Sequence, residues 1–273
     1  MQTILLTGGT GFVGAQVYKA LLREGVKVIL VVRSTERSKS SNSDLIKTVY
    51  CGDLFAKDID WWRELCSGVD VIIHCAWYVN PGDYLESIEN IKCLQGSLSM
   101  AQGAILAGVK KIVGVGTCLE YDQEGGWLST KTHLKPNSLY ASTKVSLYYV
   151  LRRLLHQTSV DFSWCRLFYL YGENENETRL AAYVKSKLDK GEVAYINSAN
   201  QVLDFLDVAV AGGEIARVAL GGDKGAINIC SGVPVTIRAF VEKIADDYGR
   251  RDLLDFTKAA ITSSQTKCVV GVK

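Results

Sequence analysis

A tyrosine and a lysine four residues apart, Tyr140 and Lys144, carry the clearest chemical signal of the sequence. They open a segment whose apolar residues recur at helical spacing, so both side chains are expected on one face of a helix. An ammonium group beside a phenol favours the phenolate and lowers the pKa of the phenol, as proton transfer near neutral pH requires. Thr117 ends the preceding predicted strand and can offer a hydroxyl to the same substrate oxygen. We expect these three residues to be catalytic.

The glycine-rich segment from residue 8 to residue 14 has the context of a dinucleotide-binding loop. An apolar strand over 3–7 leads into it, and a helix over 15–23 and an apolar strand over 26–32 are expected to follow. Glycines at three-residue spacing let the backbone approach a pyrophosphate, whose charge is stabilised at the N-terminus of the helix. The expected cofactor contacts in this loop are Gly8, Thr10, Gly11, Phe12, Val13 and Gly14.

The residue after the second strand is Arg33, and Arg37 and Lys39 follow within a few positions. In dinucleotide folds an acidic residue at this point binds the ribose 2′-hydroxyl of NAD, whereas an arginine accommodates the 2′-phosphate of NADP. The sequence therefore favours NADP(H) as the cofactor, with NAD(H) as the alternative. A solvated basic loop without a ligand is the plainer interpretation of the same residues.

Strands and helices alternate along the first 172 residues, and this alternation predicts an α/β fold with a doubly wound, parallel, Rossmann-type sheet. We expect a dinucleotide-binding domain over 1–172, to which 201–230 return, and a smaller C-terminal α/β substrate-binding lobe over 173–273. The pattern over 253–273 assigns no element to most of the segment, and within it residues 268–270 are either a strand or an unpacked tail. Further strands are expected over 48–51, 69–75, 112–115, 162–171, 193–197 and 226–230, and polar and apolar residues alternate over 201–208. Further helices are expected over 58–66, 87–107, 139–155, 179–190, 209–220 and 236–248. Thr236 is expected to cap the last of these helices.

The loops at the carboxyl ends of the strands are where open α/β sheets bind ligands. One such loop runs from Trp77 to Tyr84, and its aromatic residues, with Trp127, could line a pocket, stack on a nucleotide base or fill core space. A polar segment over 123–138 is expected to be another loop near the site. His74, which ends the preceding strand, is expected to pack in the core rather than to catalyse.

Composition and charge exclude several classes of protein. The chain has 273 residues, 48% of them hydrophobic and 22% charged, and a formal net charge of +2. Its basic residues are scattered rather than clustered, so no nucleic-acid partner is expected. An apolar run of about eighteen residues, which a membrane span needs, is missing from the sequence, so no membrane partner is expected.

The start of the chain and its cysteines indicate a reducing compartment. The first strand begins almost at Met1 and leaves no room for a secretory signal, so a cytoplasmic location is expected. The eight cysteines contain no C-x-x-C pair, and most lie within apolar strand or helix patterns. We expect reduced, buried thiols rather than disulfides or a metal site.

The chain resembles the extended short-chain dehydrogenase/reductase superfamily, in its nucleotide-sugar epimerase, dehydratase and reductase branch. The resemblance covers about residues 1–250. The motifs that carry it are the glycine loop, Asp53-Leu54, Thr117 with Tyr121, Tyr140 to Lys144, and the segments 166–172, 204–208 and 228–232.

This resemblance implies a role for each residue. Hydride would pass at the C4 atom of the nicotinamide, with Tyr140 as acid and base, Lys144 on the nicotinamide ribose and Thr117 on the substrate oxygen. Relatives commonly dimerise through the helices over 87–107 and 139–155, so a homodimer is expected. The other expected contacts are Asp53 and Leu54 on the adenine, Cys75 and Ala76 on the cofactor, and Trp77, Tyr78, Cys118, Tyr169 and Arg179 on a nucleotide-sugar substrate.

Departures from the family pattern narrow the choice of reaction. Family 4,6-dehydratases carry an Asp-Glu pair directly after the hydroxyl residue, whereas this chain has Cys118 and Leu119, which cannot do that acid and base work. Cys93 replaces a common asparagine, and Tyr169 replaces another. Where Leu203 stands, relatives usually have an arginine, and Arg179 could compensate for it in diphosphate binding.

We therefore expect NADPH-dependent reduction of the 4-keto group of a nucleotide-activated (dTDP-, CDP- or GDP-) 4-keto-6-deoxyhexose. Three alternatives stay open: a nucleotide-sugar 4-epimerase with bound NAD, a reductase of a flavonoid-like or other small carbonyl compound, and a non-catalytic NADP-binding regulatory protein. Proteins of the last kind tend to lose the tyrosine or the lysine, whereas Tyr140 and Lys144 are both present here.

Overall fold

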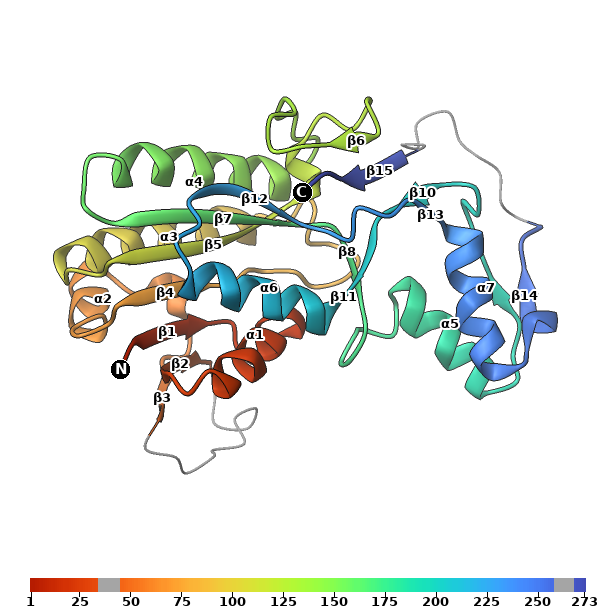
Figure 1. Ribbon diagram of the computed structural model, residues 1–273, viewed down its shortest axis with the longest axis horizontal. Coiled ribbons are helices and arrows are strands. Elements are labelled where there is room, and N and C mark those ends of the chain that lie inside the picture. Colours follow the sequence, from red (N-terminus) through yellow and green to blue (C-terminus); the bar gives the residue numbers. More distant parts are fainter. Residues whose placement is uncertain (34–44, 258–267) are drawn as a thin grey trace.

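A seven-stranded parallel sheet forms the centre of the computed structural model, which describes residues 1–33, 45–257 and 268–273 (Figure 1). The strand order is β12-β7-β5-β4-β1-β2-β3, and every neighbouring pair runs parallel. Because the order runs outward from β1 in both directions, the switch point for a ligand lies beside β1 and β4. The strands are β1 (Thr3–Thr7), β2 (Lys27–Val32), β3 (Ile46–Tyr50), β4 (Val71–His74), β5 (Lys111–Thr117), β7 (Asp161–Leu167) and β12 (Gly225–Ile229).

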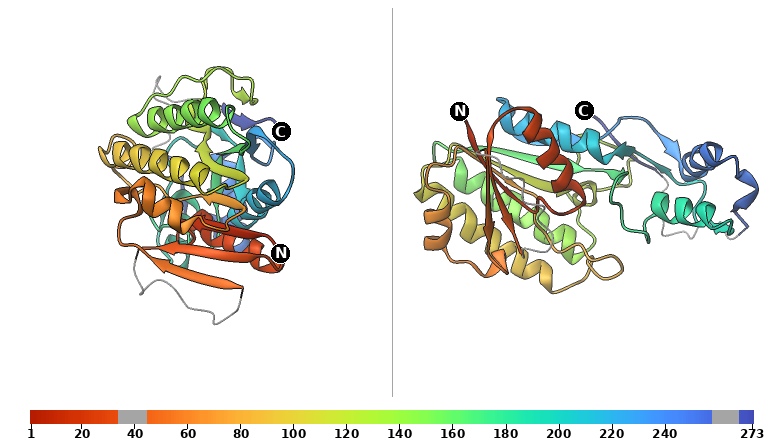
Figure 2. Two further views of the ribbon diagram at one scale, coloured as in Figure 1. Left: turned by 90° about the vertical axis from the view of Figure 1, so that its left-hand side faces the viewer. Right: turned by 90° about the horizontal axis from the view of Figure 1, so that it is seen from below.

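Helices cover both faces of this sheet, which confirms the predicted doubly wound fold (Figure 2). On one face α1 and α6 bury side chains such as Val17 and Ile215 against the strands. On the other face α2, α3 and α4 bury Trp62, Met100 and Leu151. The middle strands are covered on both sides, which is why their sequences are continuously apolar. The helices are α1 (Phe12–Arg23), α2 (Ile59–Leu65), α3 (Glu89–Leu106), α4 (Leu139–Leu155) and α6 (Val208–Leu220).

A smaller lobe extends from one end of the sheet, at the right of Figure 1. Its helices α5 (Leu180–Asp189) and α7 (Ile237–Tyr248) share an apolar core that includes Val184 and Val241. Short strands pair as β11 with β8, as β14 with β9, and in the order β13-β10-β15-β6. They are β6 (Trp127–Leu128), β8 (Tyr169–Tyr171), β9 (Ala194–Tyr195), β10 (Val202–Leu203), β11 (Phe205–Asp207), β13 (Val235–Thr236), β14 (Leu254–Asp255) and β15 (Cys268–Gly271).

The C-terminal strand β15 is bound firmly to the rest of the chain. It lies between β10 and β6, so of the two alternatives for the end of the chain the strand is confirmed for residues 268–271. The buried carboxylate of Asp204 accepts hydrogen bonds from the backbone N–H groups of Ser231 at 2.7 Å, Gly232 at 2.9 Å and Gly271 at 3.1 Å. These bonds join β15 to the connection after β12.

The expected strand over 162–171 is wrong as a single element. It is broken at Phe168, whose N–H donates to the Ile229 carbonyl at 3.3 Å. β7 stays in the central sheet, whereas β8 leaves it and pairs with β11. The chain crosses from the sheet to the lobe at this point, and the apolar run gives no sign of the crossing.

Three smaller expectations also differ from the structure. The polar segment 123–138 contains β6, whose partner β15 is too distant in sequence for local patterns to reveal. The expected strand over 193–197 shrinks to β9, and α1 begins at Phe12 because the end of the glycine loop already forms its first turn. The predicted cap of α7 is confirmed, since Thr236 Oγ1 accepts the Ala239 N–H at 3.0 Å.

The described residues offer neither a membrane-spanning helix nor a metal-binding cluster. Residues 1–33, 45–257 and 268–273 contain no helix long and apolar enough to cross a membrane. They also contain no cluster of three or more His, Cys, Asp or Glu side chains suited to a metal ion. All eight cysteines are free thiols, and six of them are buried.

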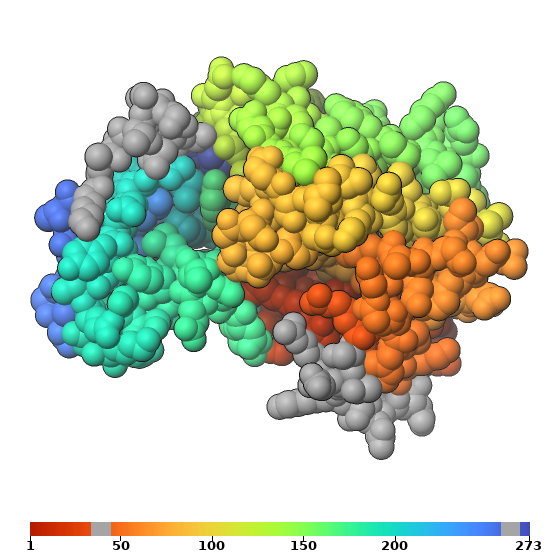
Figure 3. Space-filling model, turned by 180° about the vertical axis from the view of Figure 1, so that it is seen from behind, coloured from red at the N-terminus to blue at the C-terminus, as the bar shows by residue number. Residues whose placement is uncertain are grey.

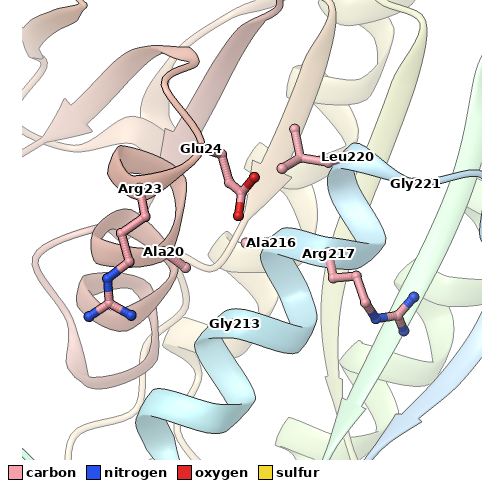
Figure 4. A pocket seen from close by; sticks show the side chains of 8 residues that line it. All are labelled: Ala20, Arg23, Glu24, Gly213, Ala216, Arg217, Leu220 and Gly221. Carbon is pink, nitrogen blue, oxygen red and sulfur yellow. The ribbon is translucent and has the colours of Figure 1, made fainter.

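A surface depression of about 440 Å³ lies between α1 and α6, away from the predicted catalytic residues (Figure 4). Arg217 on its rim is already paired with Asp223 at 2.8 Å. None of the predicted catalytic residues is among the described residues that line it, so we assign it no chemistry. Its lining residues are Ala20, Arg23, Glu24, Gly213, Ala216, Arg217, Leu220 and Gly221.

Candidate active site

The glycine loop and the start of α1 have the geometry of an anion-binding site. Gly11 is the N-cap of α1 and has no side chain with which to cap the helix, so the first amide groups of α1 can bind an anion. Gly8 has φ of +71°, and a Cβ atom there would lie 2.6 Å from the Ala76 backbone nitrogen. A Cβ atom on Gly14 would lie 2.1 Å from the Gly8 carbonyl oxygen. The loop therefore has the close-packed backbone that a pyrophosphate site requires.

His74 joins the ends of β1 and β4 beneath this loop. Its Nδ1 lies 2.8 Å from Thr7 Oγ1, and its Nε2 lies 2.8 Å from Ser97 Oγ. Because Ser97 donates its own hydrogen to the Cys93 carbonyl at 2.6 Å, Nε2 donates to Ser97 and Nδ1 accepts from Thr7. Burial, reinforced by the charge of Lys144, lowers the pKa of His74 to about 3, so the ring is neutral. The expected packing role of His74 is confirmed.

Thr117 ends β5 and forms a capping box with Glu120 across the short 3-10 helix η3 (Cys118–Glu120). Thr117 Oγ1 accepts the Leu119 N–H at 3.2 Å, and Glu120 Oε1 accepts the Thr117 N–H at 2.9 Å. The hydroxyl hydrogen of Thr117 is not used by this turn, since Oγ1 acts there as an acceptor. It can therefore be donated towards Tyr140 or a substrate.

A buried ion pair between Arg166 on β7 and Glu120 on η3 holds this turn in place. Arg166 Nε donates to Glu120 Oε2 at 2.6 Å, and their side chains are 1% and 0% exposed. Trp164 Nε1 donates to the same carboxylate, at 3.0 and 3.1 Å from its two oxygens. Arg166 Nη1 donates to Tyr121 Oη at 3.0 Å, and that hydroxyl donates to Asn228 Oδ1 at 2.7 Å. The network holds the Thr117 turn on β7 and β12.

Tyr140 lies in the first turn of α4, which Ser138 caps by accepting the Ala141 N–H at 3.2 Å. Burial raises the pKa of Tyr140 above its ordinary value, and a hydrogen bond with Thr117 opposes the rise. The expected lowering of this pKa by Lys144 is therefore wrong, because desolvation outweighs the hydrogen bond with Thr117. The phenol is protonated at neutral pH, as a proton donor must be.

The Lys144 ammonium points to the backbone of β5 rather than directly to the tyrosine. Its Nζ donates to the Val115 carbonyl at 2.7 Å and lies 5.9 Å from the centroid of the Tyr140 ring. It also lies 3.7 Å from the centroid of a ring of Trp77. Burial lowers the pKa of Lys144 to about 8, and the nearby Glu120 carboxylate opposes this change.

The loop after β4 is held from α3 by two buried side chains. Asn90 Oδ1 accepts from Trp77 Nε1 at 2.8 Å, and Asn90 Nδ2 donates to the Tyr84 carbonyl at 2.6 Å. One turn further along α3, Cys93 Sγ accepts the Tyr78 N–H at 3.4 Å. Cys93, at the position where relatives have asparagine, thus still anchors the loop.

The predicted adenosine contacts lie at the ends of β2 and β3. Arg33 is exposed at the end of β2, while Arg37 and Lys39 lie outside the described residues. The Asp53 carboxylate caps the 3-10 helix η2 (Leu54–Ala56) by accepting a backbone N–H at 2.9 Å, and Leu54 is buried. These three contacts stay predictions.

A hollow lies between the lobe and the segment that follows β4 (Figure 3), and the predicted substrate contacts have different surroundings. The Arg179 guanidinium, at the N-terminus of α5, lies 5.4 Å from the Phe12 ring of the glycine loop and 3.6 Å from Glu175. Cys118 is buried, and Tyr169 is mostly buried. Tyr78 instead directs its hydroxyl to Asp83 at 2.9 Å.

Sequence reasoning missed two residues that position the site. Glu120 could have been found, because Thr117 and Glu120 have the Thr-x-x-Glu spacing of a capping box. Asn90 carries no comparable signal, since its role depends on where Trp77 and Tyr84 lie in space.

A Rossmann-type sheet with a glycine loop, a threonine and a Tyr-x-x-x-Lys pair at one edge defines an NAD(P)-dependent oxidoreductase of the extended short-chain dehydrogenase/reductase type. The chain belongs to the NAD-dependent epimerase/dehydratase family, whose model matches residues 4–218.

Several proteins similar to this chain are named as nucleotide-sugar enzymes. It is 26% identical over 282 residues to dTDP-6-deoxy-L-talose 4-dehydrogenase (NAD(+)) of Aggregatibacter actinomycetemcomitans, with 99% of each chain covered. Two solved structures share the fold: UDP-N-acetylglucosamine 4-epimerase from Methanobrevibacter ruminantium M1 (21% identity, TM-score 0.85, 99% of this chain and 89% of that one), and DesIV, a dTDP-glucose 4,6-dehydratase from Streptomyces venezuelae with NAD bound (23% identity, TM-score 0.82, 98% and 88%).

Proposed function

We propose that this protein catalyses NADPH-dependent reduction of the 4-keto group of a nucleotide-activated 4-keto-6-deoxyhexose. The observation that carries the proposal is the pair of side chains that follows Thr117. Leu119 is aliphatic, and burial raises the pKa of the Cys118 thiol to about 12, so neither residue can add or remove a proton beside the sugar near neutral pH. Oxidoreduction at the carbon opposite Tyr140 is supported, whereas elimination of water is not.

Each group of the site has one role in the proposed reaction. The bound nicotinamide cofactor supplies the hydride to the carbonyl carbon of the substrate. The Tyr140 phenol donates its proton to the carbonyl oxygen, and the Thr117 hydroxyl orients that oxygen. The Lys144 ammonium, which donates to the Val115 carbonyl of β5, can hold the nicotinamide ribose and supplies a positive charge on the side of Tyr140, whose pKa burial nevertheless keeps raised.

The relative from Aggregatibacter supports the position of the reaction on the sugar. Its name describes oxidation at C4 of a dTDP-6-deoxyhexose, the reverse of the reduction proposed here, and it aligns with 99% of this chain. Its cofactor is NAD(+), whereas the exposed Arg33 at the end of β2 supports NADP(H) in this chain.

Purified protein incubated with NADPH and a panel of dTDP-, CDP- and GDP-4-keto-6-deoxyhexoses tests the proposal. We expect loss of absorbance at the nicotinamide band with at least one member and formation of the 4-hydroxy sugar. No NADPH oxidation with any member would contradict it. Release of tightly bound NAD on denaturation, with sugar inverted at C4 and no net oxidation, would establish the 4-epimerase instead.

Arg33→Glu tests the choice of cofactor separately. Because an exposed contact between arginine and phosphate is worth about 1.4 kcal/mol, kcat/KM with NADPH should fall about tenfold while kcat/KM with NADH does not fall. Arg23→Glu, which changes a basic residue at the far end of α1, is the control. An equal effect of Arg33→Glu on both cofactors would favour NAD(H).

We also infer a homodimer that packs through α3 and α4. Its support is the exposed apolar side chains on these helices, with Leu106 62%, Tyr149 51% and Val150 44% exposed. Light scattering of the wild type and of Tyr149→Glu tests this, and a monomeric wild type would contradict it. The eight free thiols support a reducing, cytoplasmic location.

The division of the chain into a cofactor domain and a substrate lobe is likewise our proposal. α6 and β12 return to the central sheet after the lobe has begun at residue 173, which supports the assignment of that part of 201–230 to the cofactor domain, whereas β10 and β11 pair with the short strands of the lobe.

A further inference from the structure

The indole of Trp77 covers the ammonium group of Lys144. The 3.7 Å between Lys144 Nζ and the centroid of a Trp77 ring is well within the range of about 6 Å for a cation–π contact. Lys144 is only 3% exposed, so the contact is made away from water, where the attraction is strongest. Tryptophan is also the side chain whose face attracts a cation best.

Few other groups stabilise this charge. The cysteines that face it are protonated at neutral pH, because burial raises the pKa of Cys75 to about 12 and that of Cys93 to about 11. The Glu120 carboxylate is already paired with Arg166. Five titratable groups face Lys144. They are His74 at the end of β4, Cys75 directly after it, Cys93 on α3, Glu120 on η3 and Tyr140 on α4.

The position of the indole does not depend on the lysine. Its Nε1 donates to the fully buried Asn90 at 2.8 Å, and Asn90 is itself tied to the Tyr84 and Ser87 carbonyls at 2.6 and 2.9 Å. Phe55 packs its ring against the indole in a T-shaped contact, with centroids 6.4 Å apart. The ring is thus a fixed surface on which the ammonium rests.

We propose that Trp77 is a positioning residue for Lys144: its ring, held by Asn90, keeps the ammonium charged and in place beside the Val115 carbonyl and Tyr140. The consequence for turnover rests on the proposed function, because it requires Lys144 to serve proton transfer. The contact itself does not, and it can be measured without cofactor or substrate.

Titration of the Lys144 side chain by NMR, in protein with isotope-labelled lysine, tests the contact directly. Lys144→Arg assigns the resonance by removing it. Loss of the aromatic face removes a stabiliser of the charged form, so Trp77→Leu should lower the measured pKa of Lys144 by about one unit. Trp77→Phe retains an aromatic ring face and should lower the pKa of Lys144 by less than Trp77→Leu does. Trp127→Leu, at a tryptophan that is 55% exposed on β6, should leave it unchanged.

Asn90→Ala provides a second variant in case Trp77→Leu does not fold. It keeps the indole but releases its N–H, and it should shift the Lys144 titration in the same direction by a smaller amount. An unchanged or raised Lys144 pKa in the folded Trp77 and Asn90 variants would overturn the proposal, even if turnover fell. If no ketosugar is reduced yet the titration shifts as expected, the positioning role stands and the proposed function fails.

Discussion

The site has two parts that are built in different ways. We call the part formed by Thr117, Tyr140 and Lys144 the floor, and the part that carries Arg179 the lobe side. On the floor, Thr117 and Lys144 are under 10% exposed, and buried partners such as Glu120 hold them at 2.7–2.9 Å. On the lobe side, Arg179 is 44% exposed and its ion pair with Glu175 spans 3.6 Å. The floor is preorganised for one chemical step, whereas the lobe side can change with the nucleotide or sugar at little cost to the fold.

This contrast explains why the type of reaction is easier to infer than the substrate. Proton transfer depends on side chains fixed by the sheet at the carboxyl ends of its strands, which is the edge where sheets of this kind bind ligands. Recognition of the nucleotide and hexose depends on a lobe whose strands are two to four residues long. Changes on the floor should therefore affect rate and stability, and changes on the lobe side should affect substrate affinity.

The largest effect is expected from Tyr140→Phe, which removes the proton donor from the floor. Turnover should fall about 10²- to 10⁴-fold, with unchanged cofactor affinity and thermal stability. Tyr149→Phe, on the same helix but 51% exposed, is the matched control and should retain full turnover. Steady-state kinetics with a reducible ketosugar make the comparison, and retained turnover in Tyr140→Phe would remove the tyrosine from the mechanism.

Glu120→Ala tests whether the floor depends on its buried ion pair. The change leaves the Arg166 guanidinium buried without its partner, so the free energy of unfolding should fall by about 3–5 kcal/mol. Chemical denaturation measures this. Glu124→Ala is the control, because the 81% exposed Glu124 pairs with Lys135 on the surface and its loss should not measurably change stability. Similar effects of both changes would mean that the floor is no more rigid than the surface.

Gly14→Ala separates cofactor binding from folding. The new methyl group would lie 2.1 Å from the Gly8 carbonyl oxygen and would displace the loop from the pyrophosphate. Loss of one charge-assisted hydrogen bond weakens binding about 10- to 100-fold, which quenching of protein fluorescence by NADPH can follow. Gly213→Ala on α6, where a methyl group meets no atom within 4 Å, is the matched control. Unchanged binding by Gly14→Ala would place the cofactor elsewhere.

Arg179→Gln should have the smallest effect and should act on the substrate alone. An exposed guanidinium that meets a diphosphate contributes about tenfold to affinity, so KM for the nucleotide sugar should rise about tenfold at constant kcat. Arg251→Gln, on the lobe beyond α7 and paired with Asp246, is the control. A fall in kcat without a change in KM would assign Arg179 to the floor.

Much of the cofactor half could be predicted from sequence, because its signals are local. The glycine loop, the apolar runs of β1, β4 and β5, and the Tyr140 to Lys144 spacing each report on neighbouring residues only. The break of the predicted strand at Phe168 and the pairing of β6 with β15 could not be predicted. Both depend on partners far away in the chain, and a continuous apolar run does not reveal which sheet a strand joins.

The electrostatics of the site were predicted least well. Tyr140 and Lys144 are close in sequence, and from this we expected a lowered tyrosine pKa. In the structure the lysine instead meets Val115 and Trp77, and burial raises the tyrosine pKa. Burial and the direction of a long side chain depend on tertiary packing, which sequence spacing does not contain.

Hydride transfer to C4 of the sugar is the central claim, and isotope transfer tests it most directly. The protein is incubated with NADPH carrying deuterium on the transferred position of the nicotinamide C4 and with the ketosugar that it reduces. We predict one deuterium at C4 of the product and stoichiometric NADP⁺, both formed about 10²- to 10⁴-fold more slowly with Tyr140→Phe. A product without deuterium at C4, or inversion at C4 with the cofactor unchanged, would contradict the account.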